Sequence, residues 1–562
     1  MAPLMVFGAA LWLSLGAARS GGCEEKATLS FAILTPQDDP FQGVTEVTLT
    51  AGEKEKTKTI SDPSDLSVSI DMPLSTQVQL ELIGKNSNGD VLCSGKTPYF
   101  FAVGSSQELS LWVSRVGELS LHPETLETGA GRLATADYIN EDWDDVEDDL
   151  LYAFWFGGCN ASGLPVDTNG YFDPYLQEVN TLPQMSDSDA WSDPLEPVVP
   201  RCGSVAMGIG AGMFLVFGGT NDAGQPTDEM DFVLSQGGSY RYFPLTMECG
   251  DGVDNDGDGA TDTADDDCVD GRDATEGPGK DWARSGAQIV SLGPYNGLFD
   301  ANGYSVVNSF LIAGGLTGSQ TAAATALYVT ASLGGSSTDY VFDVEPVELL
   351  EPRGLSHTAT LTVSSEDDVE VRTVLLFGGT QDASGVAVAE SLRFQIDWTA
   401  PDANFIWSQR GYTEDTDGVA LPALTGHAAV TLSDGTILVA GGKTSDGTRL
   451  ADAWLFDPAT NSIQHLPEFL GEPRAGHTMT RSGSRVLVAG GEDETGELAT
   501  HALVITADRL NGQLETTSQT PMKVPRWGHA AVLLGNAQIA ILGGFDASNT
   551  ALKSIEIYNP HP

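Results

Sequence analysis

The sequence predicts an all-β protein in which a small β-sandwich precedes a long array of repeated β units. Short alternating runs separated by turn residues fill the first part of the chain, and seven Gly-Gly pairs, each closing an apolar run, follow to its end. A unit that recurs about every 50–60 residues, with one longer gap, indicates a repeat architecture. The pairs are Gly157-Gly158, Gly218-Gly219, Gly314-Gly315, Gly378-Gly379, Gly441-Gly442, Gly490-Gly491 and Gly543-Gly544.

The composition argues against two classes of partner. Lysine and arginine total 27 against 79 acidic residues, which gives a formal net charge of −52. Such a field repels phosphate and anionic lipid, so we expect no binding to nucleic acid and no direct adsorption to a membrane. Cations are favoured, and most of the charge is interpreted as a solvated, solubilising surface.

Residues 1–22 are predicted to be an export signal, because Pro3 to Ala18 form a short apolar region. Two cleavage sites compete. Gly16-Ala17-Ala18 offers small residues to an ordinary signal peptidase, whereas Ser20-Gly21-Gly22-Cys23 resembles a bacterial lipobox in which Cys23 would be lipidated. The first predicts a secreted or periplasmic protein and the second predicts a lipid anchor at the bacterial outer membrane or cell surface.

The six cysteines agree with an oxidising compartment. If Cys23 carries lipid, Cys93 is left over and is expected to be buried as a small apolar residue. If Cys23 is free, Cys93 is its natural partner, so cysteine parity argues mildly against the lipoprotein.

Residues 23–116 are predicted to form an Ig-like β-sandwich. About seven short alternating runs, such as TLSFAIL, TQVQLELIG and QELSLWVSRV, are separated by turn-forming segments. Nothing in this module points to catalysis, and a spacer or adhesion role is expected.

Residues 117–562 carry a fuller repeat pattern. Gly426-His427-Ala428-Ala429 begins one unit, Asp434-Gly435 makes a hairpin turn, and ILVAGG and AWLFDP follow as strands. Further units open at Pro352-Arg353-Gly354 with His357, at Pro473-Arg474-Ala475-Gly476-His477 and at Pro525-Arg526-Trp527-Gly528-His529. These residues resemble the kelch family, whose repeat is a four-stranded β-propeller blade; the match is specific in the last four units and looser in the first three.

The resemblance implies a seven-bladed kelch-type β-propeller, and the ends of the array predict how it closes. The last unit stops after a third strand at Ser554 to Tyr558, while residues 117–122 form an orphan strand before the first unit. We expect this orphan strand to complete the final blade and to protect both edges. Six blades plus one degenerate unit is the alternative.

A Cys-bracketed, Asp-rich insert at residues 246–280 predicts a calcium site. Oxygen ligands at positions 1, 3, 5, 7, 9 and 12 of a calcium loop, with a glycine at position 6, converge on one ion. The matching residues are Asp254, Asp256, Asp258, Ala260 through its carbonyl, Asp262 and Asp265, with Gly259 at the turn. The segment resembles thrombospondin type 3 calcium loops, and we expect a structural calcium ion.

Two disulfides are predicted. Cys249 and Cys268 bracket the Asp-rich loop and are expected to bond to each other. Cys159 follows the first Gly-Gly pair and Cys202 opens the second unit, which in a propeller places both at one seam between neighbouring blades.

The recurrent histidines and arginines are interpreted as structural. His357, His427, His477 and His529 hold equivalent positions and are expected to hydrogen-bond to backbone within their own blade. Arg353, Arg474 and Arg526 are expected to tie blades together.

These observations favour a non-catalytic, exported binding protein that holds a protein or glycan through one propeller face. No G-x-S-x-G elbow, H-E-x-x-H pair or phosphate loop occurs in the sequence. The alternative is a carbohydrate-active enzyme that uses carboxylates on the propeller face. A third interpretation is that the acidic surface reflects a saline habitat and says nothing of partners.

Overall fold

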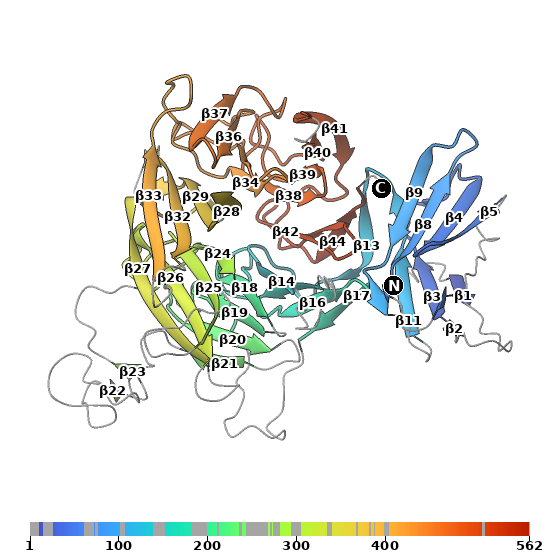
Figure 1. Ribbon diagram of the computed structural model, residues 1–562, viewed down its shortest axis with the longest axis horizontal. Helices are drawn as coiled ribbons and strands as arrows, with labels where there is room; N and C mark the ends of the chain where they lie inside the picture. Colours follow the sequence, from blue (N-terminus) through green and yellow to red (C-terminus); the bar gives the residue numbers. More distant parts are fainter. Residues whose placement is uncertain are drawn as a thin grey trace.

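The all-β class is confirmed: every regular element that the computed structural model describes is a β-strand (Figure 1). The described residues are 11–14, 26–27, 29–60, 72–73, 77–101, 107–138, 152–182, 199–210, 213–234, 239–242, 268–269, 272–273, 282–293, 305–333, 340–366, 369–381, 384–386, 388–397, 404–508 and 512–560. Over these residues, no helix has the length and apolar character needed to cross a membrane.

The N-terminal module contains two main sheets. One has the order β12 (Ser114–Arg115), β9 (Val91–Lys96), β8 (Leu80–Lys85), β4 (Glu46–Ala51) and β5 (Lys54–Thr59), and the other has β1 (Leu11–Ser14), β3 (Leu29–Leu34) and β11 (Gln107–Trp112). Two short pairs, β2 (Lys26–Ala27) with β6 (Met72–Pro73) and β7 (Gln77–Val78) with β10 (Phe100–Phe101), complete it. Alternate residues of β4 and β8, such as Leu49 and Leu82, meet Ile33 and Leu111 of the other sheet in one core. Strand β1 lies within the predicted export signal, which stays a prediction.

Seven four-stranded antiparallel sheets follow, numbered here as sheets 1 to 7. Sheets 1 to 3 are β14 (Ala134–Tyr138), β15 (Tyr152–Phe156), β16 (Gly170–Asp173) and β17 (Glu178–Thr181); β18 (Val205–Gly210), β19 (Met213–Phe217), β20 (Met230–Leu234) and β21 (Ser239–Tyr242); and β24 (Gln288–Gly293), β25 (Ser305–Ala313), β26 (Ala323–Leu333) and β27 (Tyr340–Arg353). Sheets 4 and 5 are β28 (His357–Glu366), β29 (Val369–Gly378), β32 (Ala389–Asp397) and β33 (Asn404–Tyr412); and β34 (Ala428–Thr431), β35 (Ile437–Ala440), β36 (Ala453–Asp457) and β37 (Ser462–Leu466). Sheets 6 and 7 are β38 (Thr478–Ser482), β39 (Arg485–Ala489), β40 (His501–Thr506) and β41 (Glu515–Pro521); and β42 (Ala530–Leu533), β43 (Ile539–Leu542), β44 (Ser554–Tyr558) and β13 (Leu119–Thr125). Two further short pairs are β22 (Cys268–Val269) with β23 (Arg272–Asp273) and β30 (Thr380–Gln381) with β31 (Ser384–Gly385).

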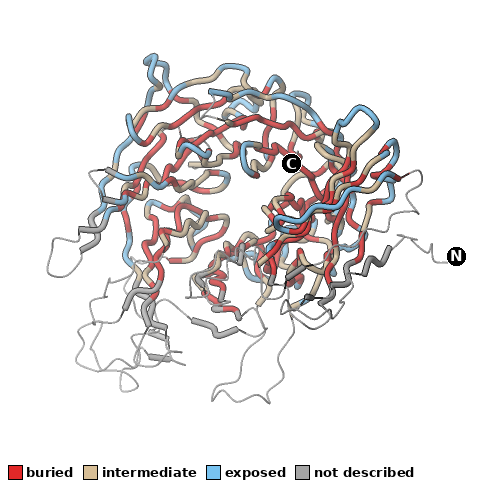
Figure 2. The backbone as a smooth tube through the Cα atoms, turned by 45° about the vertical axis from the view of Figure 1, so that its right-hand side comes forward, coloured by how far each residue is buried: buried red, intermediate tan, exposed pale blue. Residues whose placement is uncertain are grey.

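The first strands of successive sheets contact one another in a cycle. Strand β14 contacts β18, and the contacts continue through β24, β28, β34, β38 and β42, which in turn contacts β14 (Figure 1). The second strand of each sheet lies between two neighbours and is apolar on both faces for that reason. In β35, Ile437 and Val439 pack against sheet 4, whereas Leu438 and Ala440 pack against sheet 6. Figure 2 shows buried residues along the strands and exposed ones in the outer turns.

Each Gly-Gly pair ends a second strand, and in six of the seven sheets its second glycine bonds to the next sheet. A Cβ on Gly441 would lie 2.4 Å from the carbonyl oxygen of Arg474, so only glycine fits there. The amide of Gly442 then donates to that same carbonyl at 2.7 Å. The same bond recurs as Gly158 to Arg201, Gly219 to Arg284, Gly379 to Leu424, Gly491 to Arg526 and Gly544 to Ala130, the last of which joins sheet 7 to sheet 1.

The orphan strand pairs with the last strand of the chain. Strand β13 lies antiparallel to β44, with Leu119 opposite Tyr558 and Leu121 opposite Glu556, and a bulge precedes the pairing of Thr125 with Ser554. Sheet 7 is therefore built from both ends of the sheet array. Leu119 is buried in this sheet, whereas Leu121 is 40% exposed.

Candidate functional site

The predicted calcium ligands lie outside the described residues. This holds for Asp254, Asp256, Asp258, Ala260, Asp262 and Asp265, and also for Cys249 and Cys23, while Cys268 begins the short strand β22. In the part of the chain that the structure describes, no group of three or more His, Cys, Asp or Glu side chains could hold a metal ion. Cys93 is a buried free cysteine, and burial raises the pKa of its thiol to about 12.

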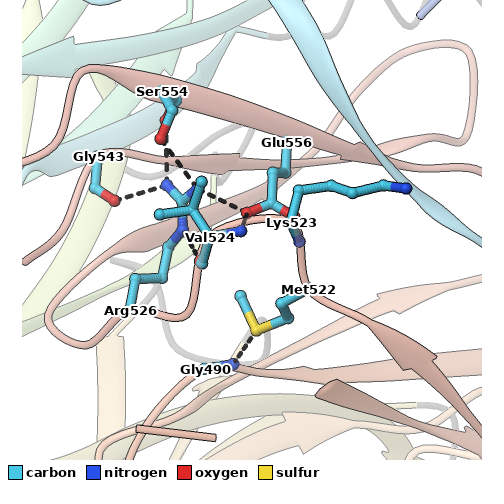
Figure 3. Close-up of polar contacts among 8 residues, drawn as sticks. All are labelled: Gly490, Met522, Lys523, Val524, Arg526, Gly543, Ser554 and Glu556. Atoms are coloured by element: carbon cyan, nitrogen blue, oxygen red, sulfur yellow. Dashed lines mark hydrogen bonds and ion pairs between the residues drawn. The ribbon is translucent and has the colours of Figure 1, made fainter. Parts of the chain in front are cut away.

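Buried arginines occupy the chain segments that lead into sheets 2, 3, 4, 6 and 7. In Figure 3, Arg526 donates to the carbonyl of Gly543 at 2.8 Å, and its Nη2 lies 2.6 Å from Oε1 of Glu556. Burial lowers the pKa of Arg526, and Glu556 partly offsets that effect. Arg201 pairs with Asp231 and Arg353 with Glu390 on the corresponding third strands, whereas Arg474 pairs with the partly exposed Glu472 two residues before it.

Arg474 and Arg526 tie neighbouring sheets through their backbone carbonyls, whereas their guanidinium groups bond inside their own sheets; the sequence predicts the tie but not that the backbone makes it. The carbonyl of Arg526 accepts the Gly491 amide of sheet 6, while its guanidinium is held inside sheet 7. Arg474 joins sheets 5 and 6 in the same way.

The recurrent histidines differ in one respect from the sequence prediction, which is that they bond to backbone within their own unit. Three of the four bond to the preceding sheet rather than only within their own: Nε2 of His357 lies 2.9 Å from the Ala313 carbonyl, and Nε2 of His427 lies 3.1 Å from the hydroxyl of Thr358. His529 meets Thr478 in the same way at 2.9 Å. The reason is that the first strand starts next to the Gly-Gly end of its neighbour, so a side chain there reaches across the seam.

Burial keeps these rings neutral. It lowers the pKa of His357 to about 4 and that of His427, His477 and His529 to about 3, with nearby Arg353, Arg474 and Arg526 adding to the effect. We therefore assign these histidines to the scaffold.

The units differ in their side chains at a rim beside the Gly-Gly pairs. In six of the seven sheets, the residue after the pair forms a short β-bridge with a residue just before a first strand. The bridged pairs are Cys159 with Gly131, Thr220 with Cys202, Leu316 with Ser285, Lys443 with Thr425, Glu492 with Ala475 and Phe545 with Trp527. The backbone at these positions is repeated, but the side chains are not.

One part of this rim, where sheets 7 and 1 meet, carries large side chains; we call Arg132, Trp527 and Phe545 the aromatic corner. The rings of Trp527 and Phe545 have centroids 4.9 Å apart, and the guanidinium carbon of Arg132 lies 5.9 Å from the Trp527 ring centre. Phe545 is buried over Gly131, where a Cβ would lie 2.2 Å from its ring. Arg132 is exposed and Trp527 is partly buried.

Arg132 adopts a backbone conformation that suits glycine. Its φ is 50°, and the residue at this position in five other sheets is a glycine with φ between 59° and 71°. These glycines are Gly203, Gly286, Gly426, Gly476 and Gly528, and the remaining sheet has Ser356 with φ 61°. A non-glycine residue in this region costs about 1–3 kcal/mol, and such strain concentrates at binding and catalytic sites.

A disulfide supports the aromatic corner. Cys159 and Cys202, the pair that the sequence places at one seam, are bonded with their Cα atoms 4.8 Å apart. The two cysteines form one buried cluster with Phe545, and Trp527 packs against that cluster. Sequence reasoning found the cysteines but missed Arg132 and Trp527, although aligning the repeats shows Trp527 where Ala475 and Thr425 stand.

Comparisons with known proteins place a kelch-repeat region in the second half. Residues 356–561 match the family model described as the KLHDC2/KLHL20/DRC7 Kelch-repeats domain. This range spans sheets 4 to 7, the four units in which the sequence pattern is most specific.

Two individual proteins are similar over parts of the chain. The dynein alpha chain of the flagellar outer arm of Chlamydomonas reinhardtii is 30% identical over 186 residues, which is 31% of this chain and 4% of that protein's length. The solved structure entitled "Structure of YjhT" is 13% identical, with a TM-score of 0.37, and the match covers 70% of this chain and 99% of that one.

Proposed function

We propose that this chain is an exported, seven-bladed kelch-type propeller that follows an Ig-like sandwich and binds a protein partner through the aromatic corner. Seven four-stranded sheets whose first strands contact each other in a cycle support the blade count. The kelch match over residues 356–561 supports the repeat type, and the face-to-face packing of the two N-terminal sheets supports the sandwich.

The observation that carries the binding role is the aromatic corner itself. Tryptophan and arginine are the residues most enriched among interface positions that dominate binding energy. Here an exposed Arg132 lies against Trp527, and Trp527 packs against the buried cluster of Phe545 and the disulfide. A rigid aromatic platform with one exposed cation suits a partner that presents an apolar side chain beside a carboxylate.

The proposal is of a binding protein rather than an enzyme. His357 and His529 bond to the preceding sheet, and Arg526 pairs with Glu556 inside sheet 7, so we assign these side chains to the scaffold and not to acid–base chemistry. A catalytic role would rest instead on carboxylates of the propeller face.

The calcium insert and the export signal are separate parts of the proposal. An ion held by Asp254 to Asp265 would bind only the native chain, so calcium should raise the melting temperature and a chelator should lower it. A melting temperature that changes with neither calcium nor chelator would contradict the calcium site. Mass measurement of the mature N-terminus would show whether Cys23 carries lipid.

Capture experiments test the binding role. The immobilised full chain is exposed to surface and secreted proteins of the source cells, and a glycan array is run in parallel. We expect the Trp527→Ala variant to capture at least about tenfold less of the partner protein, because truncating a central anchor costs 2 kcal/mol or more. Trp407→Ala is the matched control, since Trp407 is 43% exposed on the outer strand β33. Equal capture by both variants, or binding to glycans alone, would contradict the proposal.

A further inference from the structure

A polar cavity of about 330 Å³ lies where the N-terminal sandwich meets sheets 6 and 7. It is separate from the aromatic corner. Its walls come from strands β8 and β9, the β38–β39 turn, the β42–β43 turn and the end of the chain. The residues that the argument uses are Glu81, Lys96, Ser482, Arg485 and Asn559.

Hydrogen bonds between the two modules hold these walls in place. The amide of Asn559 is buried and donates to the carbonyls of Ser94 and Ser114 at 2.9 and 3.0 Å. The hydroxyl of Ser482 donates to the carbonyl of Ala537 at 2.7 Å, which joins the two turns. The cavity is therefore formed before any ligand arrives, which reduces the entropy cost of binding.

The charge of the cavity is opposite to that of the molecule. Lys96 and Arg485 line it from the sandwich and from sheet 6, while Glu81 is the one acidic residue among the lining groups. A wall with net positive charge is notable in a chain with 27 basic and 79 acidic residues. One Nη of Arg485 bonds to Thr506, and a guanidinium has five N–H donors in total.

The wall also contains backbone strain. Ala537 has a φ of 64°, whereas Gly435 and Gly483 supply positive φ in the corresponding turns of sheets 5 and 6. Backbone strain of this kind gathers at ligand sites.

We propose that this cavity binds a small hydroxy acid, such as a monosaccharide carboxylate. Lys96 and Arg485 would bind the carboxylate, and the hydroxyl oxygen of Ser482, whose hydrogen is donated to Ala537, would accept a hydrogen bond from a ligand hydroxyl. The volume is at the lower end of small-molecule sites, which fits a single sugar ring better than an oligosaccharide. Because both modules form the walls, an occupied site stabilises the junction between them.

Calorimetry and melting of the full chain with D-glucuronate, D-glucose and inorganic phosphate test the site. We expect glucuronate to bind and to raise the melting temperature, with glucose and phosphate each at least about tenfold weaker, because one loses the charge and the other the hydroxyl pattern. Lys96→Gln and Arg485→Gln should each weaken glucuronate about tenfold or more.

Lys443→Gln is the control, because Lys443 is exposed on the rim at the Gly-Gly ends and should leave glucuronate affinity unchanged. If Arg485→Gln lowers the melting temperature of the ligand-free protein, its weaker glucuronate binding does not separate a lost contact from a damaged fold. The glucuronate affinity of Lys96→Gln is then the decisive measurement, because Lys96 lies on the sandwich and not in sheet 6. Absence of glucuronate binding at about 10 mM, equal binding of glucose or phosphate, or full binding by Lys96→Gln would overturn the proposal.

Discussion

The seam between sheets 4 and 5 and the seam between sheets 1 and 2 have the same geometry but different chemistry. At the first, His427 bonds to Thr358 across the gap, and the hydroxyl of Thr431 donates to the carbonyl of Leu361. At the second, Phe154 and Phe214 have ring centroids 4.3 Å apart, and the disulfide closes the rim.

Apolar side chains pack both seams, and the two seams share the backbone tie from the second glycine of each pair. Gly158 donates to the Arg201 carbonyl at 3.1 Å and Gly379 to the Leu424 carbonyl at 2.8 Å. The difference teaches that the repeated backbone sets how sheets meet, while the side chains that fill the seam are interchangeable. The two kinds of seam should therefore fail under different conditions.

Acid should loosen the histidine seams most. The usual pKa of histidine is 6.5, and burial lowers that of His427, His477 and His529 to about 3. As the pH falls, these histidines bind protons in the unfolded chain but not in the folded chain. The free energy of unfolding therefore decreases as the pH falls below about 6.5. At pH 5 the loss is about 2 kcal/mol for each such histidine. The raised pKa of Glu390 acts in the opposite direction, since protonating it relieves a buried charge.

Hydrogen exchange measured at pH 7 and pH 5, corrected for intrinsic rates, checks this. We expect protection to fall first in sheets 4 to 7 and to persist at the seam of sheets 1 and 2. His427→Asn with His529→Asn should flatten the pH dependence, because asparagine does not titrate in this range. Uniform loss of protection around all seven sheets would contradict the comparison.

Breaking a buried arginine–carboxylate pair should lower the stability of sheet 7 and of sheet 2 by similar amounts. Arg526→Leu leaves Glu556 buried without its partner and should cost about 3–5 kcal/mol of unfolding free energy. Arg201→Leu should cost a similar amount through Asp231, which is also fully buried. Urea denaturation of both variants is the measurement, and a loss below about 1 kcal/mol in either would show that the pair is not a shared element.

Removing the disulfide should affect only the seam of sheets 1 and 2. Cys159→Ser with Cys202→Ser releases a cross-link between residues 43 positions apart and should cost about 2–4 kcal/mol. Limited proteolysis should then cut residues 152–210 sooner, with sheets 4 to 7 keeping their original rate. Faster cutting in sheet 5 instead would mean that the seams are not independent.

Much of the fold could be predicted from the sequence because the repeat depends on local backbone needs. The Gly-Gly pairs mark positions with positive φ and no room for a Cβ, and the pairing of β13 with β44 follows from a unit that lacks its last strand. The aromatic corner was harder to foresee. Arg132 and Trp527 are 395 positions apart and meet only because sheet 7 contacts sheet 1. The histidine partners were misjudged for the same reason, since Thr358 and His427 lie in different sheets.

The most direct test concerns Arg132 on the rim. We predict that this residue is retained for binding and not for stability. Arg132→Gly should leave the melting temperature unchanged or raise it, because glycine relieves the positive φ at the cost of one exposed cation–π contact. Ser356→Gly is the matched control at the equivalent position in sheet 4. Capture of the protein partner is expected to fall about tenfold with Arg132→Gly and to stay unchanged with Ser356→Gly; full capture by a stable Arg132→Gly variant would contradict the account.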